Sequence, residues 1–486
     1  MKKIILFLFI FFQLIGKIYS NNLVMGTPTV SGSTVTFTVK WDNSWKVNAA
    51  PANWDAIWVF VKRQRCDANS QGPWLHATLN STSSNHTVTG STLQVDLASS
   101  DNLGVFIRRK DQGIGNISVE TVTLTLSSAI ISSDNIAVYG IEMVYVPEGQ
   151  FYIGDGNNDA NQFKDGSSNN PKLITKAIQD AGIGIKTNYS NGNASSQPLP
   201  STFPLGYYGY YTMKHEITCQ LYCSFLNSLT YTQQIYLLDA PNSAPTVASP
   251  GSKINNRYGY NIEVKSQNAL EPAVYACDAT DNNIWNADDD GLELPVCLKV
   301  QNLLSFLDWA ALRPMTEFEY EKACRGPLTP VSYENAWGTA AYSTSYTIVN
   351  RFKTTEYSST APLGLTNIQG SNLYRVGIEA TSLSDRVHAG ATYYGILNMT
   401  GSVFERCLGG FYSDFSAFTN INGNGNISST AGADVNGWPS PSNTNYIERG
   451  GSAGNEGYRQ QSVSSRFRNL GDDYSYVFGG RGVRSY

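Results

Sequence analysis

Few residues in this chain are of the types that bind redox metals. The 486 residues include four histidines, at positions 76, 86, 215 and 388, and seven cysteines. The histidines are spread along the chain, so they do not indicate the His/His/carboxylate centre of a non-haem iron enzyme. The better candidates are oxygen-bearing side chains beside glycines, because hard cations such as Ca²⁺ need oxygen ligands and tight turns.

Two short motifs resemble known sites but lack the partners that those sites need. The segment Asn286–Gly291 (NADDDG) matches the first half of an EF-hand loop, but the twelfth position is Cys297, where that loop needs a bidentate glutamate. Residues 450–454 fit G-x-S-x-G, yet no histidine follows Ser452, as a nucleophile elbow requires. We interpret the first motif as a solvated acidic loop and the second as a structural turn.

The cysteines allow up to three disulfides in an oxidising compartment. Cys277 and Cys297 bracket the acidic loop, and they are the first pair that we expect to be bridged. Cys219 and Cys223 are one helical turn apart, so they face the same side of a helix but are poorly placed to bridge each other. Buried thiols without disulfides are the alternative for all seven.

Several longer sequence blocks occur in a fixed order. They read "MVYVPEGQFYIGD" from Met143, "HEITCQLYCSFLNSL" from His215, "LRPMTEFEYEKACRG" from Leu312 and "YGILNMTGSVFERC" from Tyr394, followed by "ERGGSAGN" and "GGRGVRSY". This series resembles the formylglycine-generating enzyme (sulfatase-modifying factor) family. The resemblance implies an α+β domain over residues 140–486 that is a variant of the C-type-lectin fold with much irregular structure.

The same resemblance implies a calcium site in the block that starts at Tyr394. The segment from Asn398 to Glu405 has the family's N-x-x-G-x-x-x-E spacing. The implied ligands are the side chains of Asn398 and Glu405 and the backbone carbonyls of Gly401 and Val403. Such an all-oxygen set suits Ca²⁺. A hairpin with a solvated glutamate is the alternative interpretation.

A second calcium site is implied less completely. Asn350 and the carbonyl of Arg351 match the first half of the family's ligand set, and Asn372 with the carbonyl of Tyr374 is the candidate for the second half. The acid that the family has there is an amide in this chain. A neutral ligand lowers the charge of the site, so we expect a lower affinity for Ca²⁺.

Copper is not expected. Members of the family that make formylglycine hold Cu(I) between two cysteine thiolates shortly after the "RGGS" block. Here Asn455 and Gln460 lie approximately at those places, and no cysteine occurs in the stretch 453–460. Soft Cu(I) needs soft ligands, which amides do not supply. A true oxidase would have to recruit thiols from Cys324, Cys407 or elsewhere.

The stretch that replaces the copper site is a candidate ligand-binding rim. C-type-lectin-like domains use this region to bind ligands, and tyrosine and arginine are frequent at binding hot spots. The candidate rim residues are Asn455, Glu456, Tyr458, Arg459 and Gln460. The arginines at 466, 468 and 484 are as well explained by salt bridges that tie the C-terminal strands together.

The residues before the family-like domain have the periodicity of strands. "STVTFTVKW" alternates apolar and threonine side chains, and "WDAIWVFVKR", "TLQVDL", "GVFIRRK" and "ETVTLTLSS" repeat this pattern between Gly/Ser/Asn turns. We therefore predict an all-β sandwich over residues 21–135. Its expected core includes four tryptophans, with an aromatic ligand platform as the alternative: Trp45, Trp54, Trp58 and Trp74.

In the second domain, two helices are predicted. Over 316–325, Thr316 and Glu319 form a capping-box pair and Gly326 marks the end. Over 216–229, apolar residues fall on one stripe. The stretches 155–200 and 230–295 are predicted to be surface insertions, and a hinge near 132–134 is expected to separate this domain from the sandwich.

The ends and the composition of the chain indicate export. Residues 1–20 read as a signal peptide, with Lys2 and Lys3 before a short apolar run and Ser20 before the cleavage point. No later segment is apolar enough to cross a membrane. The net charge of −5 and the lack of a basic tract make nucleic acid an unsuitable partner. We expect a secreted, periplasmic or cell-surface protein without a lipidated cysteine.

These observations lead to three functional hypotheses. The first is a non-catalytic, calcium-stabilised binding or assembly module at the bacterial cell surface, with a protein or glycan partner; the resemblance extends to domains of gliding-motility and type IX secretion lipoproteins, whose use is structural. The second is a copper-dependent formylglycine-generating oxidase that acts on a cysteine of a protein. The third is a lectin-like ligand-binding or adhesion protein.

Overall fold

The computed structural model describes most of the chain between residues 22 and 485. The segments outside the described residues are 1–21, 67–70, 158–161, 177–182, 187–201, 239–249, 255–260, 269, 344–346, 360–372, 382–383, 410–416, 443–445, 453–460, 469–477 and 486. The predicted signal peptide is therefore outside the described residues. The fold is rich in β-sheet, as expected, with helices in the minority. No helix of the described part is long and apolar enough to cross a bilayer.

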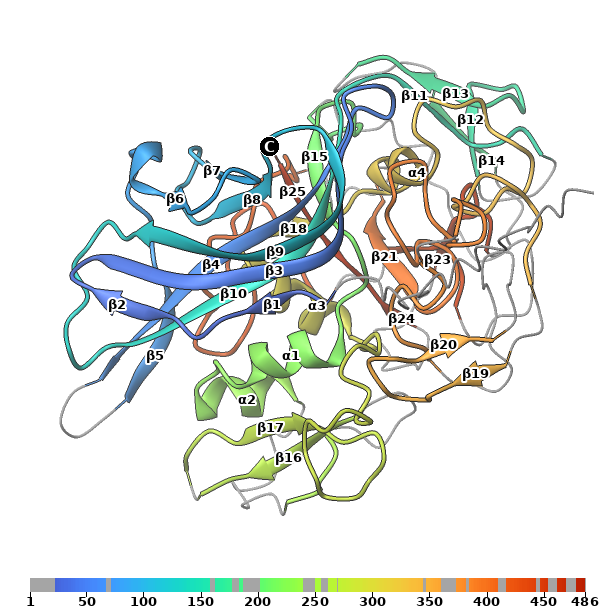
Figure 1. The fold of residues 1–486 in the computed structure, drawn as a ribbon. Helices are drawn as coiled ribbons and strands as arrows, with labels where there is room; N and C mark the ends of the chain where they lie inside the picture. Colours follow the sequence, from blue (N-terminus) through green and yellow to red (C-terminus); the bar gives the residue numbers. More distant parts are fainter. Residues whose placement is uncertain are drawn as a thin grey trace, which may run out of the picture.

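A five-stranded antiparallel sheet forms one face of the N-terminal part (Figure 1). Its order is β1-β3-β9-β6, with β2 beside β3. The side chains of Val35, Phe37, Val39 and Trp41 alternate along β3 toward the core, as the period of two predicts. The strands are β1 (Val24–Met25), β2 (Thr29–Ser31), β3 (Thr34–Lys46), β6 (Thr87–Val88) and β9 (Gly113–Thr125), and a short 3₁₀ turn, Ser83–Asn85, precedes β6.

An eight-stranded sheet lies opposite the first and continues into the C-terminal part. Its order is β18-β25-β15-β10-β4-β8-β7, with β5 beside β4. A buried cluster between the two sheets joins β3 and β9 to Ile57, Val59 and Val61 of β4. The strands are β4 (Asp55–Cys66), β5 (Gln71–His76), β7 (Leu93–Leu97), β8 (Val105–Arg109), β10 (Asn135–Val146), β15 (Tyr210–Met213), β18 (Arg313–Pro314) and β25 (Gly482–Ser485).

Strand β10 connects the two predicted domains directly. It pairs with β4 along Asn135–Val144 and with β15 along Met143–Val146. The expected hinge at 132–134 is a turn that precedes β10, and Asp134 there forms an ion pair with Arg63. The second face of β4 belongs to the largest buried cluster, which also includes Phe306 and Trp309 of the C-terminal part. The predicted sandwich and the predicted second domain therefore share a sheet and a core.

The tryptophans occupy other places than predicted. Trp58 is fully buried, but on the face of β4 opposite to the sandwich core, where its indole Nε1 donates to the Ala310 carbonyl at 2.9 Å. Successive residues of a strand face opposite sides, so a strand with two buried faces divides its side chains between two cores. Trp41 is the tryptophan of the sandwich core. Trp45, Trp54 and Trp74 are half-buried.

Both predicted helices are present, with two more (Figure 1). Helix α4 (Glu317–Arg325) starts at the predicted capping box of Thr316 and Glu319 and ends at Gly326, which has a φ of 62°. Helix α1 (Cys219–Leu226) is shorter than predicted because Thr218 caps its N-terminus through Leu221 N–H. The others are α2 (Tyr231–Leu237) and α3 (Val300–Trp309), and α3 packs at the centre of the shared core.

The remaining strands form small sheets. A four-stranded sheet, ordered β23-β22-β21-β24, lies beside α4. It contains β21 (Phe404–Leu408), β22 (Tyr446–Arg449), β23 (Phe467–Arg468) and β24 (Phe478–Gly479). The two-stranded sheets are β11 (Phe151–Ile153) with β13 (Lys172–Ile174), β12 (Gln162–Asp165) with β14 (Ile183–Lys186), β16 (Ile262–Ser266) with β17 (Val274–Cys277), and β19 (Ile348–Val349) with β20 (Tyr357–Ser358).

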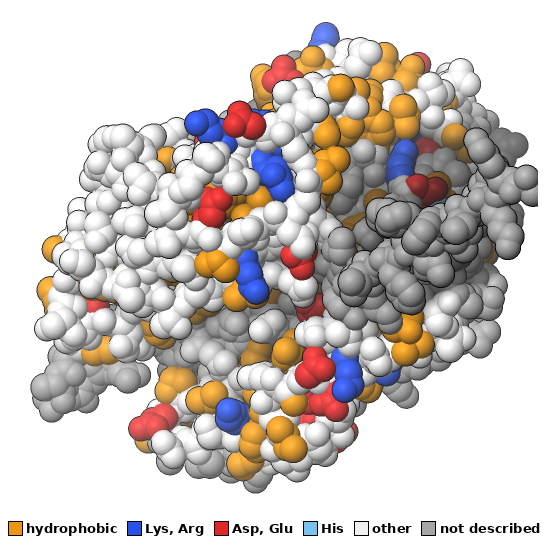
Figure 2. All heavy atoms as spheres, in the orientation of Figure 1, with side chains coloured by type: hydrophobic (Ala, Val, Ile, Leu, Met, Phe, Trp, Pro, Cys, Tyr) orange, Lys and Arg blue, Asp and Glu red, His pale blue; other side chains and the backbone are white. Residues whose placement is uncertain are grey.

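The stretch 230–295 is more than a surface insertion. Strands β16 and β17 contribute Ile262, Tyr275 and Cys277 to the shared core. Asn227, which caps the C-terminus of α1, makes two hydrogen bonds to the backbone of Tyr275. The surface of the molecule carries scattered charged side chains. Figure 2 shows no continuous patch of one sign on the face that it draws.

Candidate functional site

The predicted calcium loop is built around a buried ion pair. Glu405 lies in β21 with its side chain fully buried, and its Oε1 accepts from the guanidinium of Arg481, with Nε at 2.6 Å. Arg481 also donates to the backbone carbonyl of Asn398 at 3.1 Å. The side chain of Asn398 accepts from Gly377 N–H at 2.8 Å. Arg481 therefore contacts both predicted ligand residues, Glu405 through its carboxylate and Asn398 through its backbone carbonyl.

A second buried carboxylate, which the sequence interpretation missed, lies against the same loop. Glu216 accepts hydrogen bonds from Val403 N–H and from the Ser402 hydroxyl, both at 3.1 Å. Burial, and then the charge of Glu405, raise the pKa of Glu216 to about 8. Burial also raises the pKa of Glu405. Two carboxylates therefore share the charge of one guanidinium, that of Arg481.

These residues fit an additional cation. The Oε2 atom of Glu405 is buried and has no hydrogen-bond partner among the described residues. An orphaned carboxylate oxygen beside a second acid is stabilised by positive charge. The ligands that the resemblance implies for Ca²⁺ remain Asn398 and Glu405 through their side chains and Gly401 and Val403 through their carbonyls. Within the described part, no cluster of three histidine, cysteine or acidic side chains has the geometry of a metal centre.

The second predicted calcium site is only partly described. Asn372 lies outside the described residues. Asn350 has a φ of 57° and donates from its amide to Thr355, and the guanidinium of Arg351 lies 5.5 Å from the ring centre of Tyr374. The sequence has an amide where the family has an acid in this second site, but another acid lies in the same loop. Glu356, six residues after Asn350, is fully buried in this loop.

Protein donors already satisfy much of the Glu356 carboxylate. Its oxygens accept from Phe352 N–H at 2.6 Å and from Arg375 N–H at 3.0 Å, and Arg351 forms an ion pair with it at 3.4 Å. Glu356 therefore closes the loop over 350–356 from inside. A cation bound there would have to share this carboxylate with three donors, so this site fits an ion less well than the loop at 398–405.

The predicted ligand-binding rim is not part of the described structure. All of its residues lie in the stretch 453–460, namely Asn455, Glu456, Tyr458, Arg459 and Gln460. Two of the three arginines that follow it in the sequence form salt bridges, whereas the side chain of Arg468 lies outside the described residues. Arg466 binds Glu317, with NH2 to Oε1 at 2.8 Å, and Arg484 binds Asp101 at 2.6 Å. Arg484 therefore ties β25 to the N-terminal part rather than to a ligand.

The two thiols named as candidates for an oxidase are buried in the core. Cys324 of α4 and Cys407 of β21 are fully buried in one apolar cluster. Burial raises the pKa of Cys324 to about 12 and raises that of Cys407. Because the thiolate is the metal ligand and the nucleophile, thiols with raised pKa values in apolar surroundings are inert.

The expected disulfide between Cys277 and Cys297 is wrong. No disulfide joins any of the seven cysteines, all of which lie in the described part. Cys277 is at the end of β17, where its thiol is hydrogen-bonded to Cys223 of α1. Cys297 follows the segment that pairs with Thr218 and lies near Cys219. Bracketing one loop in sequence does not bring these two side chains together.

This arrangement predicts a simple thiol count. Cys66 is half-buried at the end of β4, whereas the other cysteines are buried. We expect a thiol reagent to modify one cysteine of the folded protein quickly and all seven after unfolding without reductant. The Cys66→Ser variant should show no fast reaction. Fewer than seven reactive thiols after unfolding would contradict the absence of disulfides.

The two motifs set aside in the sequence are structural. The acidic loop is solvated only in part, because Asp288 is exposed whereas Asp290 is fully buried. Asp290 accepts from Ala287 N–H and Asn286 accepts from Cys277 N–H, so these side chains hold the loop. The side chain of Ser452 is buried after β22, which belongs to a four-stranded sheet with mainly antiparallel pairs. That is not the parallel α/β sheet that a nucleophile elbow requires.

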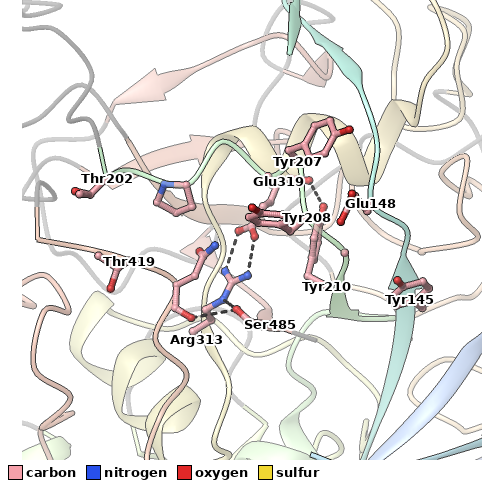
Figure 3. A pocket seen from close by; sticks show the side chains of 14 residues that line it. Tyr145, Glu148, Thr202, Tyr207, Tyr208, Tyr210, Arg313, Glu319, Thr419 and Ser485 are labelled. Carbon is pink, nitrogen blue, oxygen red and sulfur yellow. Dashed lines mark hydrogen bonds and ion pairs between the residues drawn. The ribbon is translucent and has the colours of Figure 1, made fainter. Parts of the chain in front are cut away.

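Sequence interpretation missed a pocket of about 620 Å³ that is lined in part by Glu319 of α4 (Figure 3). Residues between 202 and 210 form one wall, and Tyr145 at the end of β10 and Glu148 after it form another. At its base, Arg313 makes a bidentate ion pair with Glu319, at 2.9 and 2.7 Å. The signal that points to it is the run Gly-Tyr-Tyr-Gly-Tyr-Tyr at 206–211, which is unusually rich in tyrosine.

Comparison with known proteins adds no assignment to this geometry. No protein-family profile matches the chain, and no curated protein matches it.

Proposed function

We propose that the protein is an exported, non-catalytic binding and assembly module of the formylglycine-generating-enzyme-like family, stabilised by calcium and acting at the bacterial cell surface. In this proposal, residues 1–20 are a signal peptide, 21–135 are a β-sandwich, and 140–486 have the C-type-lectin-like variant of the family. The partner is a protein or a glycan, and the protein belongs to a surface assembly. Copper has no role.

Contacts between the family-like blocks support this assignment. Met143 of the first block pairs with Met213 beside the second, and Glu216 of the second block binds Val403 of the fourth. Arg449 of the "ERGGS" block binds two glutamates of the third block. Segments that the resemblance singles out in the sequence are therefore the segments that hold one another in space.

The main support for a non-catalytic protein is a difference in accessibility between the two candidate thiols and the pocket. Cys324 and Cys407 are fully buried with raised pKa values, whereas the tyrosine-lined pocket is open and Tyr208 in its wall is 63% exposed. An oxidase needs thiolates that can reach copper and a substrate cysteine. A binding module needs only an accessible, preformed cavity.

Two assays on the purified mature protein test the proposal. Elemental mass spectrometry should find about one or two calcium ions per chain, the number of sites that the oxygen ligands allow, and no bound copper after incubation with Cu(I). A cysteine-containing sulfatase peptide should remain unoxidised. Stoichiometric copper together with formylglycine in the peptide would instead establish the oxidase.

Calcium should also raise the thermal stability. We expect added Ca²⁺ to raise Tm of the wild type, because the ion would neutralise the charge shared by Glu216 and Glu405. The shift should disappear in Asn398→Gly, which removes a ligand but keeps the positive φ of 59° and leaves Arg481 on Glu405. Glu356→Gln in the second loop should retain it. An equal shift in Asn398→Gly would remove this site from the proposal.

A further inference from the structure

The pocket beside α4 is lined by tyrosine rings and short polar side chains. Tyr207 and Tyr208 come from the loop before β15, and Tyr145 comes from the end of β10. In Figure 3, Tyr208 lies over the ion pair at the base, with Thr202 and Thr419 to one side in this view. Rings with hydroxyls around them offer apolar faces for C–H groups and hydrogen bonds for hydroxyls at the same time.

The charged groups at the base are already neutralised. Both oxygens of Glu319 accept from Arg313, and the Nε of Arg313 donates to the Ser485 hydroxyl at 2.9 Å. Glu148 is the remaining charged side chain of the lining, and it is exposed at the rim. An anionic ligand would find no available cation there and would be repelled by Glu148. The lining therefore disfavours an anionic ligand.

One polar atom of the lining lacks a protein partner. The side-chain oxygen of Asn420 has no hydrogen-bond partner among the described residues. The backbone of Asn420 is fixed, since its carbonyl accepts from the Ser485 hydroxyl at 3.1 Å and its φ is 65°. The oxygen itself is buried, so a ligand hydroxyl would reach it only if the Asn420 side chain turned toward the pocket.

The tyrosine loop is held in place from below by a buried lysine. Lys322 of α4 donates to three successive backbone carbonyls, those of Gly206 and Tyr207 at 2.8 Å and that of Tyr208 at 3.2 Å. Gly206 has a φ of 74°, and a Cβ there would lie 3.2 Å from Glu319. Because the loop is fixed before a ligand arrives, binding does not have to order it.

We infer that this pocket binds a neutral oligosaccharide, with its sugar rings against Tyr207 and Tyr208 and its hydroxyls on the polar rim. The inference rests on the proposed function as a binding module and names the ligand class. A proline-rich peptide also binds tyrosine-lined grooves. The hydroxyl, carboxylate and amide groups of the lining favour the saccharide, because proline rings have no donors to satisfy them.

The test is a screen of the full-length mature protein on an array of neutral and acidic glycans, followed by calorimetric titration of the best neutral hit. We expect wild-type binding to neutral glycans only. Tyr208→Ala should weaken it at least tenfold. Tyr236→Ala is the matched control, because Tyr236 is 48% exposed on α2, outside this pocket, and its loss should leave the affinity unchanged.

Addition of a chelator separates the pocket from the predicted calcium loop. The affinity should be retained, since none of the predicted calcium ligands lines this pocket. Absence of binding to every neutral glycan, unchanged affinity in Tyr208→Ala, or displacement by a proline-rich peptide would each overturn the ligand class. Those results would not contradict the proposal of a non-catalytic binding module. Oxidation of the cysteine peptide would contradict that proposal.

Discussion

Replacing Arg449 with methionine is expected to lower the free energy of unfolding by about 3–5 kcal/mol, the usual cost of removing one member of a buried ion-pair network. The guanidinium of Arg449 is fully buried and binds Glu321 at 2.5 Å and Glu317 at 3.3 Å. It also donates to the Val463 carbonyl at 2.7 Å. Methionine has a similar volume but leaves two acids of α4 with less compensation.

The two glutamates that Arg449 binds belong to a larger network of buried ion pairs. Glu321 also binds Arg325 at 3.0 Å and accepts from Gly154 N–H at 2.7 Å, and Glu317 also binds Arg466. These contacts fix α4 against β11 and β22, so the network positions the base of the tyrosine pocket. Partners in one network couple, and the Glu321→Gln, Arg449→Met double variant should lose less stability than the sum of the single changes.

Urea unfolding of the three variants measures this effect. Lys353→Met is the control, because Lys353 is 44% exposed and lies 3.9 Å from an exposed aspartate. Such surface pairs contribute about 0–1 kcal/mol. A loss below about 1 kcal/mol in Arg449→Met would mean that the network carries no more than that surface pair and would contradict its role as the scaffold of α4.

Local patterns in the sequence predicted the elements whose determinants are local. Thr316, Glu319 and Gly326 are close in sequence, and they specify α4 correctly from end to end. The alternation along β3 likewise identifies the buried face of that strand. Helix α3 was not predicted, although its apolar residues Val300, Leu303, Leu304 and Leu307 have helical spacing. Its polar stripe is buried as well, since nine of its ten residues are buried.

Contacts between distant residues could not be predicted in the same way. Glu216 meets Ser402 across 186 residues, so the calcium loop was assigned one carboxylate where the structure has two. The pocket combines residues from the loop before β15, from α4 and from the segment after residue 417. No single segment contains enough of it to be recognised. Sequence interpretation also divided the chain near residue 135, where β10 in fact joins two parts through one sheet.

Replacing Lys62 with methionine is the second change with a large expected effect. Lys62 lies in β4 of the N-terminal part and is fully buried, and its ammonium donates to the Trp309 carbonyl at 2.6 Å and to the Gly425 carbonyl. Both acceptors belong to the C-terminal part. Methionine leaves two buried carbonyls without this donor, at a cost of about 1–3 kcal/mol each, offset in part by removal of a buried charge.

The loss should depend on pH in a defined direction. Burial lowers the pKa of Lys62 well below its usual value of 10.5, and the neighbouring Asp308 opposes this shift. Between the folded and the unfolded pKa, the unfolded chain therefore binds more protons, and the wild type gains stability as pH rises toward 10.5. A neutral amine still has N–H groups for both carbonyls. Lys62→Met lacks this gain. The free energy of unfolding should therefore differ more between the variant and the wild type at pH 9.5 than at pH 6.

The same measurement tests whether the two parts form one cooperative unit. Because β10 and the shared core join them, the wild type should unfold in a single transition, and Lys62→Met should move that transition as a whole. The ammonium of Lys353 is exposed, so the change in the free energy of unfolding caused by Lys353→Met should not increase with pH. Two separate transitions, with only one of them shifted, would show that the sandwich and the C-terminal part are independent domains. A pH-independent loss would instead mean that Lys62 stabilises the contact by packing alone.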